Sequence, residues 1–133
     1  MKKIIDKIAL IYLRDRKVLS TRSRGKTNFY LPGGKREAGE SDLRCLQREI
    51  KEEMNVEILP ASVVYYGTFS APADGHPNGV SVKMTCYTAD FTGNPVASAE
   101  IEEIRELTTD NVQEISAVDK LIFADLHNKG LLK

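Results

Sequence analysis

The chain has 133 residues, of which 41% are hydrophobic and 29% charged. This mixture excludes a wholly disordered chain, and the length predicts one domain over residues 1–133. The 19 basic and 19 acidic residues give a net charge of zero, which argues against a strongly basic binder of a nucleic-acid polymer. Because Cys45 and Cys86 form no CxxC pair and no apolar run is long enough for a secretory core or a membrane span, we expect a soluble cytoplasmic protein with reduced thiols and no membrane partner.

The first third of the chain has the pattern of strands and a basic loop. A continuous apolar run at residues 8–13 predicts a buried strand, and residues 17–21 predict its return after a polar turn. Residues 22–28 read as a basic loop. Residues 29–31 predict a short strand that ends at Pro32-Gly33-Gly34, a strong breaker of regular structure.

Residues 41–54 show the clearest helical pattern. Ser41 is a predicted N-cap, and Asn55 is a predicted C-cap in the left-handed conformation. The spacing of three, four and four residues places the apolar positions on one stripe that faces the core. That stripe comprises Leu43, Leu46, Ile50 and Met54.

Strands dominate the rest of the chain. They are predicted at residues 56–58, 63–70, 80–91 and 104–107, with a loop rich in proline and glycine at residues 71–79. Residues 117–128 predict a second amphipathic helix, whose stripe comprises Val118, Leu121, Ile122 and Leu126. Two separated helices among many strands predict an α+β fold, a mixed α/β sandwich.

Three carboxylates lie together on the first predicted helix. Glu49, Glu52 and Glu53 occupy positions i, i+3 and i+4, where like charges repel and destabilise the helix. A hard cation such as Mg²⁺ removes that repulsion, because it takes oxygen ligands from carboxylates and phosphates. Arg48 is placed to pair with one of the carboxylates. A solvated glutamate-rich face remains the alternative interpretation.

The glycines before the helix favour a ligand site. Gly33 and Gly34 follow a predicted strand and precede a short loop that contains Glu40. A Gly-Gly loop lets the backbone approach a ligand closely. We therefore expect these two residues to offer a carbonyl to a metal ion or to face a phosphate.

These residues carry a resemblance to a known family. Gly34, Glu40, Arg48-Glu49-Ile50 and Glu52-Glu53, with their spacing and the following Val56, resemble the Nudix box G-x5-E-x7-R-E-U-x-E-E-x-G-U over residues 34–56. One position departs, because Asn55 stands where the family has glycine. Asn is the usual second choice for a left-handed helix end, so we expect a modest cost in stability. The resemblance implies a Nudix fold of the small MutT-like type, with a mixed β-sheet between helices.

The resemblance also implies roles for the box. Glu52 and Glu53 are then the principal carboxylate ligands of Mg²⁺, for which Mn²⁺ can substitute. Glu49 is a further ligand or the base that activates water, and the carbonyl of Gly33 is a metal ligand. Arg48 holds the glutamates through ion pairs. Glu40 supports the loop or the metal shell.

Small members of the family often take a further ligand or the base from a residue well after the box. Here the acidic stretch at residues 99–107 is the source, with Glu100 the first choice and Glu103 the second; a solvated acidic turn is the alternative. Candidate substrate-binding residues are Arg22 and Lys35 for phosphate, Gly34, Tyr30 for stacking on a base, and Asp119 within the segment 116–119. His76 reads as an exposed loop residue.

The implied activity is hydrolysis of a phosphoanhydride bond in a nucleotide. The small size favours a nucleoside triphosphate or modified nucleotide, cleaved to a nucleoside monophosphate plus pyrophosphate or X-phosphate. A dinucleotide, an ADP-ribose-type compound or a nucleotide sugar is the alternative substrate, and a non-catalytic nucleotide sensor the alternative class; a homodimer is also compatible with the family. Residues 1–36 carry a net charge of +9 and residues 37–133 carry −9, a division that suits cations gripping a polyphosphate opposite metal-binding glutamates.

Overall fold

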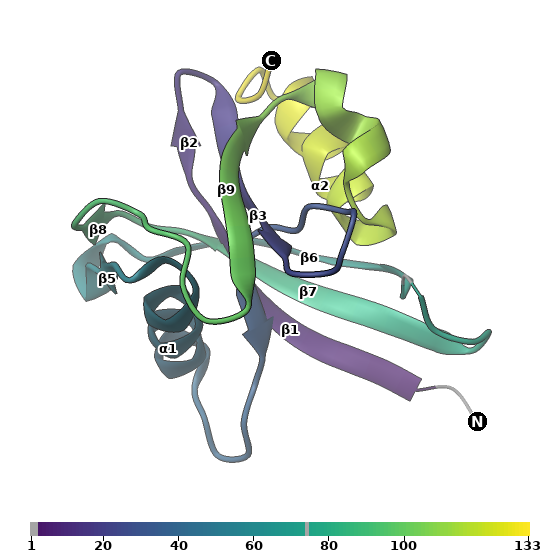
Figure 1. The fold of residues 1–133 in the computed structure, drawn as a ribbon, viewed down its shortest axis with the longest axis horizontal. Coiled ribbons are helices and arrows are strands. Elements are labelled where there is room, and N and C mark those ends of the chain that lie inside the picture. The colour runs from purple at the N-terminus through teal and green to yellow at the C-terminus, as the bar shows by residue number, and fades with distance from the viewer. Residues whose placement is uncertain (1–2, 74) are drawn as a thin grey trace.

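The computed structural model describes residues 3–73 and 75–133, and its largest element in that part is a mixed sheet. Its strand order is β4 (Gly33–Lys35), β1 (Lys3–Ile11), β7 (Val80–Thr88) and β6 (Val64–Pro72). β1 runs parallel to β7, whereas β4 and β6 pair antiparallel with their neighbours (Figure 1). The mixed pairing places β4, which carries the two glycines, directly beside the long first strand.

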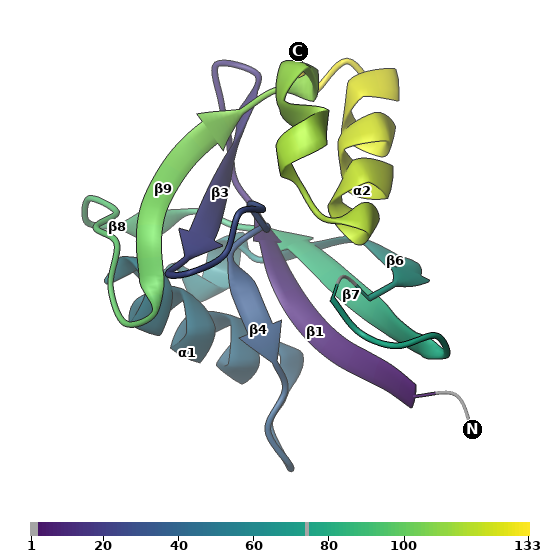
Figure 2. The same ribbon diagram turned by 45° about the vertical axis from the view of Figure 1, so that its right-hand side comes forward.

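A second sheet crosses the first (Figure 2). It consists of β2 (Leu13–Arg14), β3 (Lys17–Ser23) and β9 (Ile101–Leu107), all antiparallel. A short pair, β5 (Glu57–Ile58) and β8 (Phe91–Thr92), follows the first helix. Single 3₁₀ turns lie at Pro60–Ser62 and Thr109–Glu114. The register of β3 and β9 shifts between Arg22 and Ser23, at the end of β3 where the basic loop begins.

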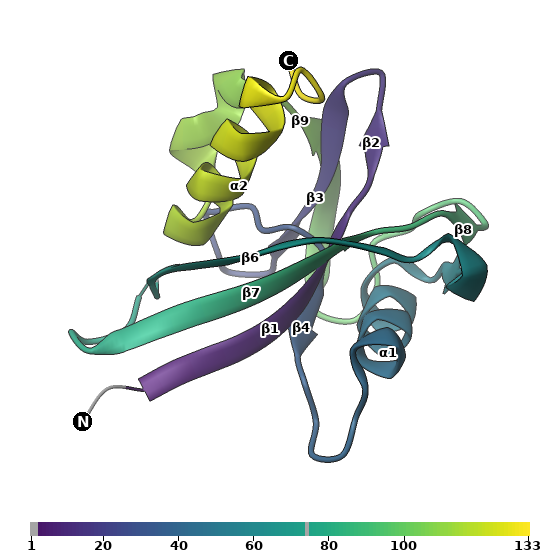
Figure 3. The same cartoon turned by 180° about the vertical axis from the view of Figure 1, so that it is seen from behind.

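The two α-helices lie on opposite sides of the sheets (Figures 1 and 3). α1 (Asp42–Met54) covers one core, and α2 (Ala117–Asn128) covers the other. The continuous apolar run of β1 serves both, because alternate residues face opposite sides of a strand: Ile8 and Leu10 pack under α1, whereas Ala9 and Ile11 pack under α2. The predicted α+β fold with a mixed sheet between helices is therefore confirmed. No helix in the described part is long and apolar enough to span a membrane.

The ends of α1 are as predicted, but its buried face is not. The Ser41 side chain accepts a hydrogen bond from the backbone N–H of Arg44, and Asn55 adopts the left-handed conformation with φ 55°. Leu43 is exposed, contrary to the predicted stripe, because the inward positions of the first turns are filled by Cys45 and Leu46. α2 has the predicted bounds, yet Leu121 is also exposed and Phe123 is buried in its place.

Several predicted strands differ from the structure. β1 starts at Lys3 rather than at residue 8, and the strand predicted at residues 80–91 is divided into β7 and β8. Residues 29–31 form only isolated bridges, and the neighbouring glycine segment forms β4 instead. Glycine is required there: a Cβ on Gly33 would lie 2.0 Å from the carbonyl oxygen of Ile8 on β1. β9 starts at Ile101 rather than at residue 104, because its acidic residues are paired with arginines, as Arg22 of β3 with Glu103 shows.

Candidate active site

Glu53 is the most deeply buried carboxylate of α1. Its side chain faces β4, where its Oε1 accepts a hydrogen bond of 2.9 Å from the backbone N–H of Gly33, and it is 6% exposed. Burial, with the negative charges of Glu49 and Glu100, raises the pKa of Glu53 to about 8 against the opposing effects of the Gly33 N–H and the charge of Lys7. Such a perturbed group in a cleft is a candidate for chemistry.

The two glycines of β4 leave room for β1 on one side and for the carboxylate of Glu49 on the other. Gly33 has φ +148° and lies against β1, as described above. A Cβ on Gly34 would lie 2.4 Å from the carboxyl carbon of Glu49. A larger residue at Gly33 would displace β1, and one at Gly34 would push the carboxylate of Glu49 out of its place.

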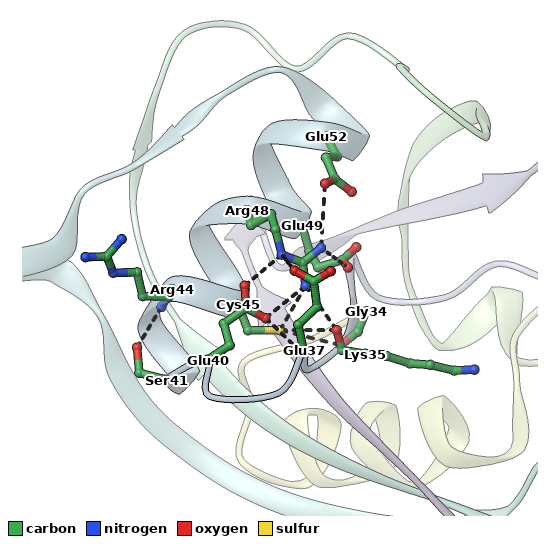
Figure 4. A network of polar contacts seen from close by, with 10 residues as sticks. All are labelled: Gly34, Lys35, Glu37, Glu40, Ser41, Arg44, Cys45, Arg48, Glu49 and Glu52. Carbon is green, nitrogen blue, oxygen red and sulfur yellow. Dashed lines mark hydrogen bonds and ion pairs between the residues drawn. The ribbon is translucent and has the colours of Figure 1, made fainter.

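Arg48 clamps the outer side of α1 (Figure 4). Its Nε and Nη2 donate to the two carboxylate oxygens of Glu40 at 2.7 and 2.9 Å, and its Nη1 donates to Glu49 Oε1 at 2.8 Å. Nη2 also donates to the carbonyl of Lys35 at 3.1 Å. These contacts hold the pKa of Glu40 down at about 2. The pKa of Glu49 is raised, because burial outweighs the effect of the guanidinium.

A pocket of about 450 Å³ opens in front of these groups. Three carboxylates line it, from Glu49, Glu53 and Glu100, together with three lysines, Lys7, Lys26 and Lys35. Its apolar part comprises Ile5, Ile8, Ala9, Leu31, Pro72, Ala73, Val82, Met84 and Val118. This volume and this mixture of polar and apolar lining are typical of small-molecule sites.

The acidic candidates separate clearly. Glu100 lines the pocket, whereas Glu103 pairs with Arg22 and Arg105 on the second sheet. The side chain of Glu52 is 51% exposed, lies 3.6 Å from Arg48 and is not among the lining residues. Of the three box glutamates that the sequence groups together, the structure therefore places two at the pocket and one outside it.

The candidate substrate-binding residues also divide. Gly34, Tyr30 and Lys35 line the pocket, and Arg22 does not. Asp119 is fully buried at the start of α2, where its Oδ2 accepts the backbone N–H of Leu31 at 2.9 Å. The residues that flank this part of α2 in the lining are Ser116 and Val118.

Two lining residues were missed by the sequence reasoning. Lys7 shares a face of β1 with Ile5 and Ala9, and its Nζ lies 5.2 Å from the centre of the Tyr30 ring. A charge inside an apolar strand was the signal that would have found it. His76 is exposed, as predicted for a loop residue, and it also lines the pocket.

Carboxylates and a carbonyl are the donors that suit a hard cation. In residues 3–73 and 75–133, no three His, Cys, Asp or Glu side chains are already gathered closely enough to hold a metal ion. The residues still fit one: burial and the charges of Glu49 and Glu100 raise the pKa of Glu53, and a cation among these carboxylates would relieve that cost.

Most of the chain, including every residue that lines the pocket, matches one family model. The model described as the NUDIX domain matches residues 5–126. The chain belongs to the Nudix family. It is a Nudix hydrolase, and members of this family are pyrophosphohydrolases that act on nucleoside diphosphate derivatives. No curated protein sequence matches the chain.

Solved structures show the same Nudix fold. A Nudix family protein from Chromobacterium violaceum is 25% identical, with a TM-score of 0.74 over 96% of this chain and 79% of that one. A MutT protein from Bacillus halodurans is also 25% identical, with a TM-score of 0.70 over 90% of this chain and 80% of its own. A MutT Nudix hydrolase from Burkholderia pseudomallei, at 19% identity, matches in fold with a TM-score of 0.77 over 92% and 98%.

Proposed function

We propose that this Nudix hydrolase is a Mg²⁺-dependent pyrophosphohydrolase of nucleoside triphosphates or modified nucleotides. It cleaves between the α and β phosphates and releases a nucleoside monophosphate with pyrophosphate or X-phosphate. One observation supports this most: a single pocket brings together three carboxylates, three lysines and an apolar wall. Those parts correspond to a metal ion, a polyphosphate and a nucleobase.

The lysines are the cations best placed for phosphate. Among the described residues, none of Lys7, Lys26 and Lys35 forms an ion pair with a carboxylate, whereas Arg22, Arg36 and Arg48 all do. A lysine ammonium binds phosphate as a mobile point charge. Arg22, Arg36 and Arg48 thus hold neighbouring segments together, and Lys7, Lys26 and Lys35 are the cations left to bind the substrate.

The metal-binding groups are Glu53, Glu49 and Glu100 with the carbonyl of Gly33, and Glu52 stays a ligand candidate that needs its exposed side chain to turn inward. When bound, Mg²⁺ supplies Lewis-acid stabilisation of the charge that develops on the phosphoryl oxygens. Arg48 fixes one oxygen of Glu49 at 2.8 Å and leaves its other oxygen available. The Gly33 N–H bond does the same for Glu53.

Glu100 is the proposed general base. It lines the pocket across from α1, within range to raise the pKa of both Glu49 and Glu53 by its charge. Its carboxylate takes a proton from water as the water oxygen bonds to the α phosphorus, and the bond from that phosphorus to the bridging oxygen breaks to release pyrophosphate or X-phosphate. Glu49 is the alternative base, since burial also raises its pKa.

The apolar wall would accept the base of the nucleotide. Val82 and Met84 of β7, Ile5 of β1 and Val118 of α2 form the apolar part of the lining, and Tyr30 offers a ring. Asp119 supports this region by holding the backbone of Leu31. We extend the proposal to a cytoplasmic location, since both cysteines are free and buried.

A substrate panel tests the proposal. Purified protein with Mg²⁺ is incubated with nucleoside triphosphates, modified triphosphates, dinucleotides, ADP-ribose and nucleotide sugars, and products are identified by mass. We expect monophosphate and pyrophosphate from at least one triphosphate, and no turnover with excess EDTA. Turnover confined to dinucleotides or sugars would support the alternative substrate classes. Tight binding without turnover of any compound would identify a sensor and refute the proposal.

A further inference from the structure

The guanidinium of Arg22 joins two segments that border the pocket. Its Nη1 donates to the carbonyl of Lys26 at 3.1 Å, and its Nη2 lies 2.8 Å from Glu102 Oε1 and 3.2 Å from Glu103 Oε1. Its Nε also donates to Glu103 at 3.4 Å. One side chain thus ties the basic loop after β3 to the start of β9.

Both joined segments supply lining residues. Lys26 lines the pocket from the loop, and Glu100, the residue before β9, lines it from the other segment. The backbone N–H of Arg24 donates to the carbonyl of Glu100 at 2.9 Å, and that of Lys26 donates to Ser23 at 3.1 Å. The register of β3 and β9 shifts at this point, so the ladder alone does not fix the position of the loop.

Arg22 itself is fully engaged. All three of its nitrogens have partners among the hydrogen bonds and ion pairs given above, its guanidinium lies 6.0 Å from the centre of the Phe29 ring, and its side chain is 21% exposed. It does not line the pocket. To bind a phosphate it would first have to release two carboxylates, whereas Lys26 beside it needs no such exchange.

We infer that Arg22 is a positioning residue, which holds Glu100 at the pocket through the start of β9 and does not contact the substrate phosphates. The inference rests on the proposed function, in which Glu100 acts as base or metal ligand. The two possible roles of Arg22 predict different kinetics. Removing a side chain that binds phosphate in the ground state raises KM, whereas displacing the base lowers kcat.

The test compares Arg22→Gln, Glu100→Gln and the double variant. We expect Arg22→Gln to lower kcat about 10- to 100-fold, the range for groups that orient a metal ligand, with KM changed less than about threefold. The double variant should lie within about threefold of Glu100→Gln, because two residues that act through one step are not additive. Arg22→Lys should recover part of kcat, since it keeps one ion pair.

Arg14→Gln is the matched control. Arg14 makes a two-bond contact with Glu106 at the other end of β9, at 3.0 and 3.1 Å, away from the pocket. We expect wild-type kcat and KM from it. If Arg22→Gln fails to fold, Arg22→Lys replaces it in the cycle.

Several results would overturn the inference: a rise in KM with kcat retained, multiplicative losses in the double variant, wild-type kinetics of Arg22→Gln, or wild-type kcat of Glu100→Gln. If the wild type hydrolyses no nucleotide, the proposed function fails, and Mn²⁺ affinity measured by electron paramagnetic resonance decides the inference instead. Equal weakening of Mn²⁺ binding by the two single variants then supports it, and any other result refutes it.

Discussion

Two glutamates of the Nudix box, one in the loop before α1 and one near the end of α1, have opposite properties. On the outer side, Glu40 accepts two hydrogen bonds from Arg48, which keep its pKa near 2 (Figure 4). On the pocket side, Glu53 accepts one backbone N–H and is otherwise buried, which raises its pKa to about 8. A glutamate side chain is therefore a paired, ionised structural group at position 40, and a buried group with a raised pKa at position 53.

The difference shows which carboxylates are available for chemistry. Glu40 has both carboxylate oxygens engaged by Arg48 and gains little from a metal ion, whereas Glu49 gives only one oxygen to Arg48. A buried glutamate that faces other carboxylates gains most from a cation, because the cation removes both repulsion and desolvation cost. The contrast gives Arg48 and Glu40 a structural role and gives the carboxylates that line the pocket a role in the reaction. Five experiments test that assignment.

Replacing Glu53 should have the largest effect. Glu53→Gln keeps an oxygen that can accept the Gly33 N–H but removes the charge, so we expect kcat to fall by at least about 10³-fold. Steady-state kinetics with Mg²⁺ measure it. Glu57→Gln is the control, since Glu57 pairs with Lys51 in solvent at 2.9 Å just beyond α1. Loss of less than tenfold would show that the buried carboxylate is not a metal ligand.

Glu100 and Glu103 should differ although they are three residues apart. Glu100→Gln should lower kcat about 10²-fold, as expected for removal of a general base. Glu103→Gln should change kcat only a few-fold, because Glu103 is paired with Arg22 and Arg105. The two variants are assayed separately with one substrate. Equal losses, or a larger loss for Glu103→Gln, would contradict the separation of pocket and outer carboxylates.

Arg48 tests the outer network itself. Arg48→Gln removes the fork that joins Glu40 to Glu49, and we expect a loss of about 10- to 100-fold in activity or Mn²⁺ affinity, the usual cost of removing a group that orients a ligand. Arg44→Gln is the matched control on α1, since Arg44 is exposed. A loss in stability without any change in metal affinity would limit Arg48 to a structural role.

Sequence reasoning recovers the helix and its motif because both depend on local spacing. Ser41, Asn55 and the bounds of α2 follow from cap chemistry and periodicity. The engagement of Arg22 does not follow, because it depends on partners from a distant element, Glu102 and Glu103 on β9. Lys7 reaches the pocket only through the pairing of β1 with β4 and β7. Long-range pairing was the missing information.

The pKa of Glu53 predicts how the metal-free protein responds to pH. The folded state binds this proton more tightly than the unfolded state, whose pKa is near 4.5, so the contribution is complete below that pH and is lost as pH rises through about 8. The stability of the wild type relative to Glu53→Gln should fall between pH 5 and 8, measured by thermal unfolding in EDTA. Mg²⁺ should restore more stability at pH 8 than at pH 5. A constant difference across this range would refute the raised pKa.

The smallest expected effect lies at the end of α1, where the chain has asparagine in place of the family's glycine. Asn55 adopts φ 55° and ψ 39°, and its backbone N–H donates to the carbonyl of Lys51 at 3.0 Å. Glycine reaches this conformation without the Cβ penalty, so Asn55→Gly should stabilise the fold by up to about 1 kcal/mol, and Asn55→Ala should destabilise it by about 1 kcal/mol.

Denaturant unfolding of the three proteins measures this order, and all three should keep wild-type kcat, because the backbone bond to Lys51 survives in each. Asn55→Gly and Asn55→Ala therefore separate the effect of the helix cap on stability from the effect of the carboxylates on activity. If Asn55→Gly changed kcat while leaving stability unaltered, the conformation of residue 55 would be setting the position of Glu53, two residues earlier, and the pocket side of α1 would depend on its cap as well as on its burial.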